Sequence, residues 1–213
     1  ALLTNSGTSA LHSMYVGADL KEGDEVICPA YTFYATVTPL FFTGAIPVLA
    51  DSKTDGNIDP QDIERKITEN TRGIVVTHMW GLPCDMDAIT DIARQHNLML
   101  FEDTSHAHGA TYRGKKTGTF GDASAFSLQG QKTLTGGEGG ILLTDSDEIF
   151  YRALLLGHYN KRCKNEIPGD HQLYQYAVTG MGLKLRIHPI AAAIADEQFD
   201  NLESILEGRQ KTA

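Results

Sequence analysis

Cysteine is scarce in this 213-residue sequence, which contains only Cys28, Cys84 and Cys163. Their number is odd, they are widely spaced, and no two of them form a CxxC pair. Neither a zinc knuckle nor a disulfide framework is therefore indicated. Free thiols are typical of a reducing compartment, which favours the cytoplasm.

The sequence also lacks long apolar runs. No run reaches the ~20 residues that a membrane-spanning helix needs, and no secretory leader is visible at the start of the chain. We therefore expect a cytoplasmic protein without a membrane partner.

Basic residues are outnumbered by acidic ones, with 18 Lys and Arg against 27 Asp and Glu and a net charge of −9. No Lys/Arg-rich run interrupts this balance, so a nucleic-acid partner is not expected. An anionic cofactor is still compatible with this charge, because backbone N–H groups and hydroxyls can bind phosphate locally.

Strand-like and helix-like segments alternate along the chain, which predicts an α/β fold. We expect one domain with three layers, in which helices flank both faces of a mostly parallel sheet. There are no internal repeats. Strands are expected at Gly23–Pro29, Ile46–Ala50, Gly73–Thr77, Leu98–Phe101, Ala123–Ser127 and Ile141–Thr144, and helices at Ser9–Val16, Thr32–Phe42, Met86–His96, Asp147–Leu156 and Pro189–Leu206.

Two further segments stand out in this pattern. Asp59 followed by Pro60 predicts a helix start, because aspartate caps helices well and proline fits the first helical position. The polar stretch Lys161–Tyr176 predicts an irregular, mobile loop.

The two ends of the sequence suggest a partial chain. Ala1 opens a strand-like segment with no preceding element and no initiator Met. The chain ends in the charged helical stretch Glu203–Lys211 with no closing element after it. We therefore expect that a first helix is missing.

The small residues of SGTSA, Ser6–Ala10, lie between a predicted strand and a predicted helix. Small side chains at a helix start leave backbone N–H groups free, and the helix dipole favours an anion there. An ordinary helix cap without an anion would have the same sequence pattern. The spacing does not fit a nucleotide P-loop.

An acidic pair ends the apolar strand in FEDTSHAHGA, Phe101–Ala110. Carboxyl ends of strands form the ligand-binding edge of open α/β sheets. Asp103 at this edge can hold a cationic ring nitrogen by a charge-assisted hydrogen bond, or it can cap the following turn. His106 and His108 form a poor chelate without a third ligand, so no metal site is expected.

Lys132 lies in the Gly-flanked segment AFSLQGQKTLTGGEGG, five residues after Ser127. Its neighbours are small or uncharged, which indicates partial burial. Partial burial lowers the pKa of a lysine and makes it available for covalent bonding to a carbonyl group. The alternative is a lysine with a structural role in a loop.

An aromatic cluster occurs in PAYTFYAT, Pro29–Thr36, at a strand-to-helix junction. An aromatic ring in this place can stack on a flat ligand. Packing against the protein is the alternative.

The order of these features resembles the fold-type-I pyridoxal 5′-phosphate (PLP) enzymes and, more closely, the DegT/StrS family of sugar aminotransferases. The resemblance covers nearly the whole chain, from Ser6 to about Leu206. The segments that carry it are SGTSALH, GDEVICPAYTFYAT, GAIPVLAD, DMDAI, EDTSHAHGA, GTFGDASAFSLQGQK, GEGGILLTD and GLKLRIHP.

The resemblance implies a set of cofactor-binding residues. Lys132 lies where the family has the lysine that binds PLP covalently, and Asp103 lies where its carboxylate pairs with the pyridinium nitrogen. His106 takes the place of a Gln or His beside the phenolic oxygen. The other matched positions are Phe33, which stacks on the ring, and the phosphate ligands Thr8, Ser9 (through its backbone) and Ser127.

One position departs from the family pattern. The family commonly has an Asn in a GYNYR segment that reaches the partner subunit's phosphate, whereas this sequence has Lys184 in GLKLR. A cation suits a phosphate as a point charge. The resemblance also implies a homodimer with shared active sites. The segment GLKLRIHP is more similar to the branch of the family that acts on cyclitols and antibiotic precursors.

The function implied by the resemblance is transfer of an amino group from glutamate or glutamine to a keto sugar, often nucleotide-linked, or to a keto cyclitol. The whole chain, residues 1–213, would be the PLP-binding large domain, without the small C-terminal domain of the family. A catalytically silent PLP- or ligand-binding regulatory relative remains an alternative. A PLP-dependent sugar dehydratase is disfavoured, because that branch has His in place of Lys132.

Overall fold

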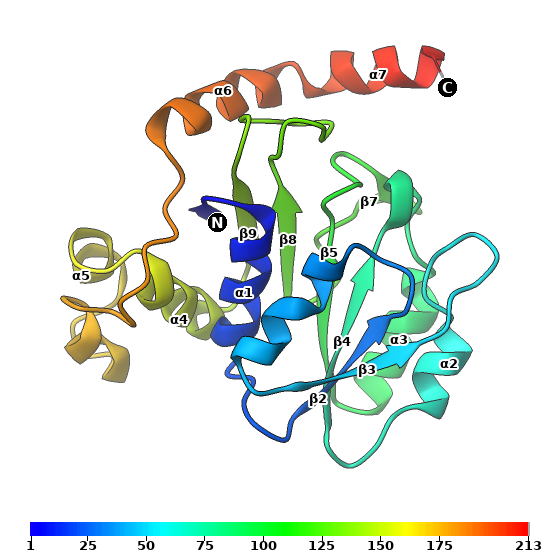
Figure 1. Ribbon diagram of the computed structural model, residues 1–213, viewed down its shortest axis with the longest axis horizontal. Coiled ribbons are helices and arrows are strands. Elements are labelled where there is room, and N and C mark those ends of the chain that lie inside the picture. The colour runs from blue at the N-terminus through cyan, green and yellow to red at the C-terminus, as the bar shows by residue number, and fades with distance from the viewer. Residues whose placement is uncertain (213) are drawn as a thin grey trace.

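The computed structural model describes residues 1–212, and its centre is a seven-stranded sheet (Figure 1). The strand order is β1-β9-β8-β5-β4-β2-β3. The strands of this sheet are β1 (Leu2–Thr4), β2 (Glu25–Pro29), β3 (Ile46–Ala50), β4 (Thr71–Thr77), β5 (Met99–Asp103), β8 (Ala123–Ser127) and β9 (Gly140–Thr144).

All but one of these strands run in the same direction. Strands β3, β2, β4, β5 and β8 pair in parallel, whereas β9 pairs antiparallel with both β8 and β1. The mostly parallel sheet predicted from the sequence is therefore confirmed.

Helices cover both faces of the sheet, so the predicted three-layer α/β architecture is also confirmed. Side chains alternate between the faces along each strand, as Ile74 and Val75 show by belonging to different core clusters. One cluster lies under α1 (Gly7–Gly17) and α4 (Asp147–Gly157), and the other lies under α2 (Pro60–Arg65) and α3 (Met86–Gln95).

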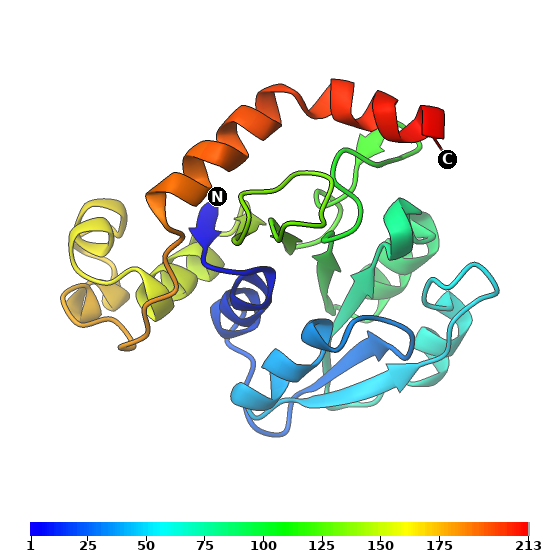
Figure 2. The same ribbon diagram turned by 45° about the horizontal axis from the view of Figure 1, so that its top comes forward.

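Two helices, α6 (Pro189–Asp200) and α7 (Leu202–Thr212), pass across the edge of the sheet where the parallel strands end (Figures 1 and 2). The single helix predicted at Pro189–Leu206 is therefore wrong. The break lies at Asn201, whose side-chain Nδ2 donates to the carbonyl oxygen of Glu197 at 2.8 Å. Such local side-chain bonds compete with the helical pattern. None of the helices within residues 1–212 is long and apolar enough to cross a membrane.

The helix predicted at Thr32–Phe42 is replaced by two short 3₁₀ helices, η1 (Tyr34–Thr36) and η2 (Thr38–Phe42). Pro39 contributes to the break, because it has no N–H to donate to a carbonyl oxygen of the preceding turn.

The mobile loop predicted at Lys161–Tyr176 is also wrong. The segment contains α5 (Lys161–Glu166) and η4 (Gln172–Tyr176). Cys163 and Ile167 are buried in the core, and Arg162 pairs with Glu166 through two hydrogen bonds. These contacts order a segment whose composition is polar.

A small hairpin was not predicted at all. Strands β6 (Thr111–Tyr112) and β7 (Lys115–Lys116) pair antiparallel across a two-residue turn. Arg113 and Gly114 both have positive φ angles, 49° and 82°, as such tight turns require. The 3₁₀ turn η3 (Met79–Gly81), which follows β4, was also missed.

The carboxylate of Glu102 is fully buried at the end of β5 and accepts several hydrogen bonds. The backbone N–H groups of Gly118, Phe120 and Gly121 donate to it at 2.7–2.9 Å, and Nε2 of His78 lies 3.0 Å from its Oε2. Burial raises the pKa of Glu102, but the hydrogen bonds outweigh burial and leave this pKa below its usual value.

We expect Glu102→Gln to destabilise the protein by about 1.5–3 kcal/mol at pH 7, the range for hydrogen bonds to a charged group. The folded-state pKa lies below the unfolded one, so the carboxylate stabilises the fold above the unfolded value of about 4.3. The difference between wild type and variant should shrink as the pH falls below that value. Urea unfolding of the full-length protein at several pH values measures this difference in the free energy of unfolding.

The matched control is Glu64→Gln on the exposed surface of α2, which should leave stability nearly unchanged. Equal stability of the Glu102→Gln and Glu64→Gln variants at pH 7 would contradict the role given to Glu102.

Candidate active site

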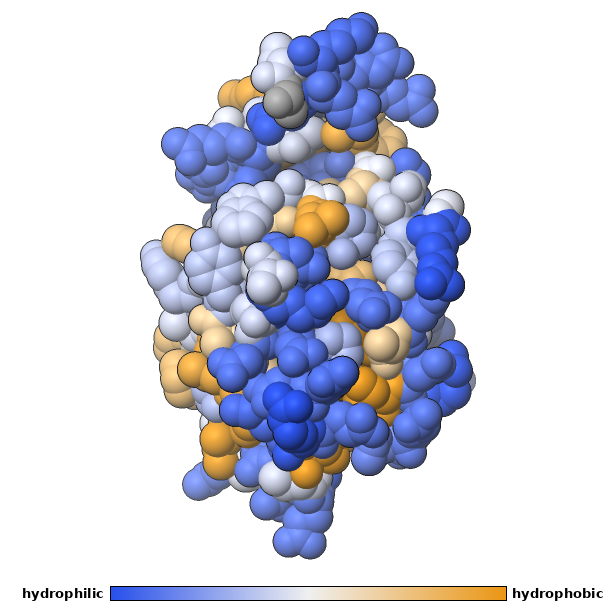
Figure 3. Space-filling model, turned by 90° about the vertical axis from the view of Figure 1, so that its right-hand side faces the viewer, coloured by the Kyte–Doolittle hydropathy of each residue, from blue (hydrophilic) through white to orange (hydrophobic). Residues whose placement is uncertain are grey.

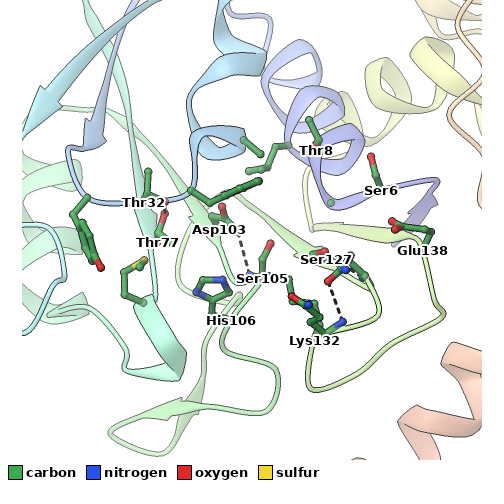
Figure 4. A pocket seen from close by; sticks show the side chains of 18 residues that line it. Ser6, Thr8, Thr32, Thr77, Asp103, Ser105, His106, Ser127, Lys132 and Glu138 are labelled. Atoms are coloured by element: carbon green, nitrogen blue, oxygen red, sulfur yellow. Dashed lines mark hydrogen bonds between the residues drawn. The ribbon is translucent and has the colours of Figure 1, made fainter.

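A cavity of about 650 Å³ opens at the carboxyl ends of neighbouring parallel strands. Thr32 follows β2, Thr77 ends β4, Asp103 ends β5 and Ser127 ends β8. Figure 4 shows these side chains arranged around one space. This edge of an open α/β sheet is where ligands generally bind.

Asp103 is buried and held by two donors. The hydroxyl of Thr36 donates to Oδ2 at 2.7 Å. The backbone N–H of Ser105 donates to Oδ1 at 3.1 Å (Figure 4). The hydroxyl of Thr36 also lies 2.8 Å from that of Thr32, so a chain of hydroxyls supports the carboxylate.

Lys132 lies on the loop after β8, where its backbone N–H donates to the carbonyl oxygen of Gln129 at 2.9 Å. Its side chain is half-buried. Burial lowers the pKa of the Lys132 amine, and the negative charge of Asp103 partly opposes this effect. The amine is therefore easier to deprotonate than that of an exposed lysine.

His106 contributes a polar atom without a partner. Its Nδ1 is buried and makes no hydrogen bond among the described residues. Burial and the nearby charge of Lys132 lower the pKa of His106, whereas Asp103 raises it. Because the net shift is downward, the ring is neutral at pH 7 and has one nitrogen ready to bond a ligand atom.

The N-terminus of α1 forms one wall of the cavity. Ser6 caps the helix by accepting the backbone N–H of Ser9 at 3.1 Å. Thr8 is exposed toward the cavity. A Cβ atom added at Gly7 would lie 2.7 Å from the Cβ atom of Ser127, so only glycine lets the helix end approach the strand this closely. Backbone N–H groups of α1 and the hydroxyls of Thr8 and Ser127 thus lie together at the helix end, where the helix dipole favours an anion.

Phe33 presents an exposed aromatic ring at the mouth of the cavity. Its side chain is 57% exposed, and its ring centroid lies 4.1 Å from that of Tyr34. The ring therefore remains available to contact a flat ligand.

Six of the predicted site residues line this one cavity, and two lie outside its lining. The six are Thr8, Phe33, Asp103, His106, Ser127 and Lys132. The backbone N–H of Ser9, predicted to bind phosphate, donates to the hydroxyl of Ser6. Lys184 is an exposed residue before α6.

The sequence analysis missed Thr36, which bonds Asp103 directly, and it missed Thr77 and Glu138 in the lining. The repeated threonines of YTFYATVT were the available signal. Their pairing with Asp103 depends on strand order, which the sequence does not display.

Within residues 1–212, no group of three His, Cys, Asp or Glu side chains is arranged to hold a metal ion.

Comparison with curated proteins identifies relatives along the whole chain. It is 37% identical over 214 residues to a GDP-perosamine synthase of Escherichia coli O157:H7, a match that covers 100% of this chain and 56% of that protein. It is 39% identical to a putative L-glutamine:3-amino-2,3-dideoxy-scyllo-inosose aminotransferase of Micromonospora echinospora, covering 100% of this chain and 49% of that protein. The chain thus spans about half the length of these relatives.

A solved structure matches as well. DesV of S. venezuelae, determined in complex with a ketimine intermediate, is 33% identical and superposes with a TM-score of 0.82. The match covers 95% of this chain and 52% of DesV.

The family predicted from the sequence motifs is confirmed. The model of the DegT/DnrJ/EryC1/StrS aminotransferase family matches residues 1–213. The aminotransferases of this family use PLP as their cofactor. Relatives that aminate a sugar and relatives that aminate a cyclitol both occur among the similar proteins. This chain belongs to the DegT/DnrJ/EryC1/StrS aminotransferase family.

Proposed function

We propose that this chain is the PLP-binding large domain of an aminotransferase that moves an amino group from glutamate or glutamine to a keto sugar or keto cyclitol. The observation that carries this proposal is the cavity that places Lys132 and Asp103 beside the N-terminus of α1. An amine, a carboxylate and an anion-binding helix end are the groups that PLP requires.

The residues present fit this cofactor. The orphaned Nδ1 of His106 would bond its phenolic oxygen, and Asp103 would pair with its ring nitrogen. The α1 end with Thr8 and Ser127 would hold its phosphate. Lys132 would hold it covalently through Nζ. Phe33 would contact its ring.

When bound, PLP supplies an electron sink that stabilises negative charge on the carbon atom that loses a proton. Lys132 would move this proton, because a half-buried amine with a lowered pKa can accept a proton and return it. Asp103 would keep the ring nitrogen protonated. Thr36 would position the carboxylate through its 2.7 Å hydrogen bond.

The working unit in this proposal is a cytoplasmic homodimer with shared active sites, in which Lys184 approaches the neighbouring subunit's cofactor phosphate. The observation behind this role is that Lys184 is exposed and lies outside the cavity lining of its own chain. A residue that serves the partner's site is expected to have this placement.

The alternatives are a PLP-dependent sugar dehydratase and a catalytically silent relative. Lys132 disfavours the dehydratase, because an amine at this position can hold the cofactor covalently and a histidine cannot. A silent relative would bind PLP or another ligand without turnover.

Lys132→Ala should abolish transamination, because it removes the amine that holds the cofactor and transfers the proton. The unfolding temperature should stay close to that of wild type, because Lys132 lies on a Gly-flanked loop and not in the core. A coupled assay measures turnover. Absorbance spectra measure the visible band of the lysine–cofactor bond, which borohydride abolishes in wild type.

The matched control is Lys21→Ala, which removes an exposed lysine outside the cavity lining. Turnover by Lys132→Ala above the rate without enzyme would refute the assignment. A wild-type protein that shows the visible band but no turnover with any keto acceptor would favour the silent alternative.

Thr36→Val should lower kcat about 10- to 100-fold, less than the loss in Asp103→Asn. Valine keeps the shape of Thr36 but cannot donate to the carboxylate, and one hydrogen bond to a charged group is worth about 1.5–3 kcal/mol. KM for the acceptor should change little, because Thr36 is buried behind Asp103. Thr36→Ser keeps the hydroxyl and should restore most of kcat, whereas a defect equal in both variants would mean that Thr36 only packs.

Lys184→Ala should weaken PLP retention, and the difference from wild type should shrink as ionic strength rises, because salt screens the charge that Lys184 contributes. Equilibrium dialysis at several salt concentrations measures this loss.

The decisive form of this experiment mixes Lys132→Ala with Lys184→Ala subunits. If Lys184 acts on the neighbouring site, one site of each mixed dimer carries both defects and the other carries neither, so activity exceeds that of both parents. If the mixed dimers are no more active than their Lys184→Ala subunits alone would be, Lys184 acts in the site of its own subunit or in no site.

A further inference from the structure

Three threonine hydroxyls lie together beside Asp103. Oγ1 of Thr32 lies 2.8 Å from that of Thr36 and 3.0 Å from that of Thr77. Thr32 follows β2, Thr36 belongs to η1 and Thr77 ends β4. Strand pairing brings these residues together, because β4 lies between β2 and β5 and Thr77 is the register partner of Asp103.

The cluster is largely shielded from water. Thr36 is fully buried and Thr77 is 3% exposed, whereas Thr32 is half-buried at the cavity. Hydrophilic side chains cover much of the face that Figure 3 shows, where water can satisfy their hydrogen-bonding groups. A buried hydroxyl has no such partner and destabilises the fold unless it bonds to protein atoms. The three threonines meet this requirement by bonding to one another and to Asp103.

The donor and the acceptor of each bond follow from counting hydrogen atoms. A hydroxyl has one hydrogen to donate and two lone pairs with which to accept. Thr36 uses its hydrogen for Oδ2 of Asp103, so it can only accept from Thr32. Thr32 has then used its own hydrogen, so it can only accept from Thr77. The donors therefore run in the order Thr77, Thr32, Thr36, and the last one donates to the carboxylate.

Tyr15 fixes the backbone at the last donor of this chain. Its hydroxyl donates to the carbonyl oxygen of Thr36 at 2.7 Å, and its ring packs edge-on against Phe101 with centroids 5.7 Å apart. Burial raises the pKa of Tyr15 well above its usual value, so the hydroxyl stays protonated and remains a donor. Thr36 is therefore held by its backbone while its side chain donates to Asp103.

We infer that Thr32 and Thr77 are positioning residues, which act on Asp103 only through Thr36 as an ordered chain of donors. This inference rests on the proposed function, in which Asp103 pairs with the ring nitrogen of PLP. The chain holds Oδ2, and the backbone N–H of Ser105 holds Oδ1. The carboxylate cannot rotate without losing both bonds, and hydrogen bonds in a chain strengthen one another.

The ring nitrogen of bound, isotope-labelled PLP reports on this chain without turnover. Thr36→Val should move its NMR chemical shift toward that of unprotonated pyridine, because a carboxylate that has lost a donor is a stronger base and takes more of the shared proton. Thr32→Val and Thr77→Val should move the shift in the same direction by smaller amounts. Neither should move it further in a Thr36→Val background, since Thr36 is their connection to the carboxylate.

Turnover gives a second readout. Thr32→Val and Thr77→Val should each lower kcat about 2- to 10-fold, the range for one neutral hydrogen bond, and leave KM for the acceptor unchanged. Thr32→Ser and Thr77→Ser keep the hydroxyl and should restore kcat. A residue that only packs would show the opposite order, because valine keeps the shape of threonine and serine loses its methyl group.

The matched control is Thr104→Val. Thr104 follows Asp103 in the sequence and is fully buried, but its hydroxyl has no hydrogen-bond partner among the described residues. Removing this hydroxyl should leave both the nitrogen shift and kcat unchanged. The control separates the loss of a donor in the chain from the loss of any buried hydroxyl near Asp103.

Urea unfolding of the full-length protein without cofactor tests the chain independently of PLP. The losses of stability in Thr32→Val and Thr36→Val should not add in the double variant, because residues in one hydrogen-bond network are coupled. The single variants and their serine counterparts keep the inference testable if Thr36→Val does not fold.

Two results would overturn the inference. One is an effect of Thr32→Val or Thr77→Val on the nitrogen shift that persists in full in the Thr36→Val background, which would mean that these residues act on the ligand directly. The other is an unchanged nitrogen shift in both single variants. Failure of the proposed function is distinguishable, because a wild-type protein that does not bind PLP would still show the coupling of Thr32 and Thr36 during unfolding.

Discussion

The buried carboxylate of Glu102 joins two segments of the chain that flank β5 in the sheet. Its hydrogen bonds reach the His78 ring at the turn after β4 and the backbone N–H groups of the Gly118–Gly121 segment before β8. Since these segments come from distant parts of the chain, one side chain joins the end of β5 to the turn after β4 and to the segment that leads into β8. The position of Asp103 depends on this arrangement because Asp103 is the next residue, and the turn after β4 depends on it through His78.

Alternation along β5 explains why two adjacent acids have different tasks. Successive side chains of a strand point to opposite faces of the sheet, so Phe101 belongs to the core under α1 while Leu100 belongs to the core under α3. Glu102 points to the same face as Leu100, where backbone N–H groups of the loop before β8 surround its carboxylate. Asp103 points to the same face as Phe101 and accepts a hydrogen bond from the hydroxyl of Thr36 beside the cavity.

Local patterns predicted the sheet and most of its strands, and the motifs that resemble the DegT/StrS family predicted six of the cavity residues. Apolar strands end in polar residues, and Lys132 and Asp103 occur in motifs with fixed spacing. Prediction from the sequence failed where structure depends on distant partners. The ordered segment around α5 depends on burial of Cys163, and the site contact of Thr36 depends on the pairing of β2, β4 and β5. The composition of one segment cannot reveal such contacts.

The charge distribution reconciles an acidic protein with an anionic cofactor. A net charge of −9 repels phosphate at long range, but salt screens charges beyond roughly 8 Å at physiological ionic strength. Within that distance, the α1 N-terminus presents backbone N–H groups beside Ser127 and Thr8. Lys132 lines the same cavity. In the proposed site, affinity for an anion would therefore depend on these local donors more than on the net charge of the chain.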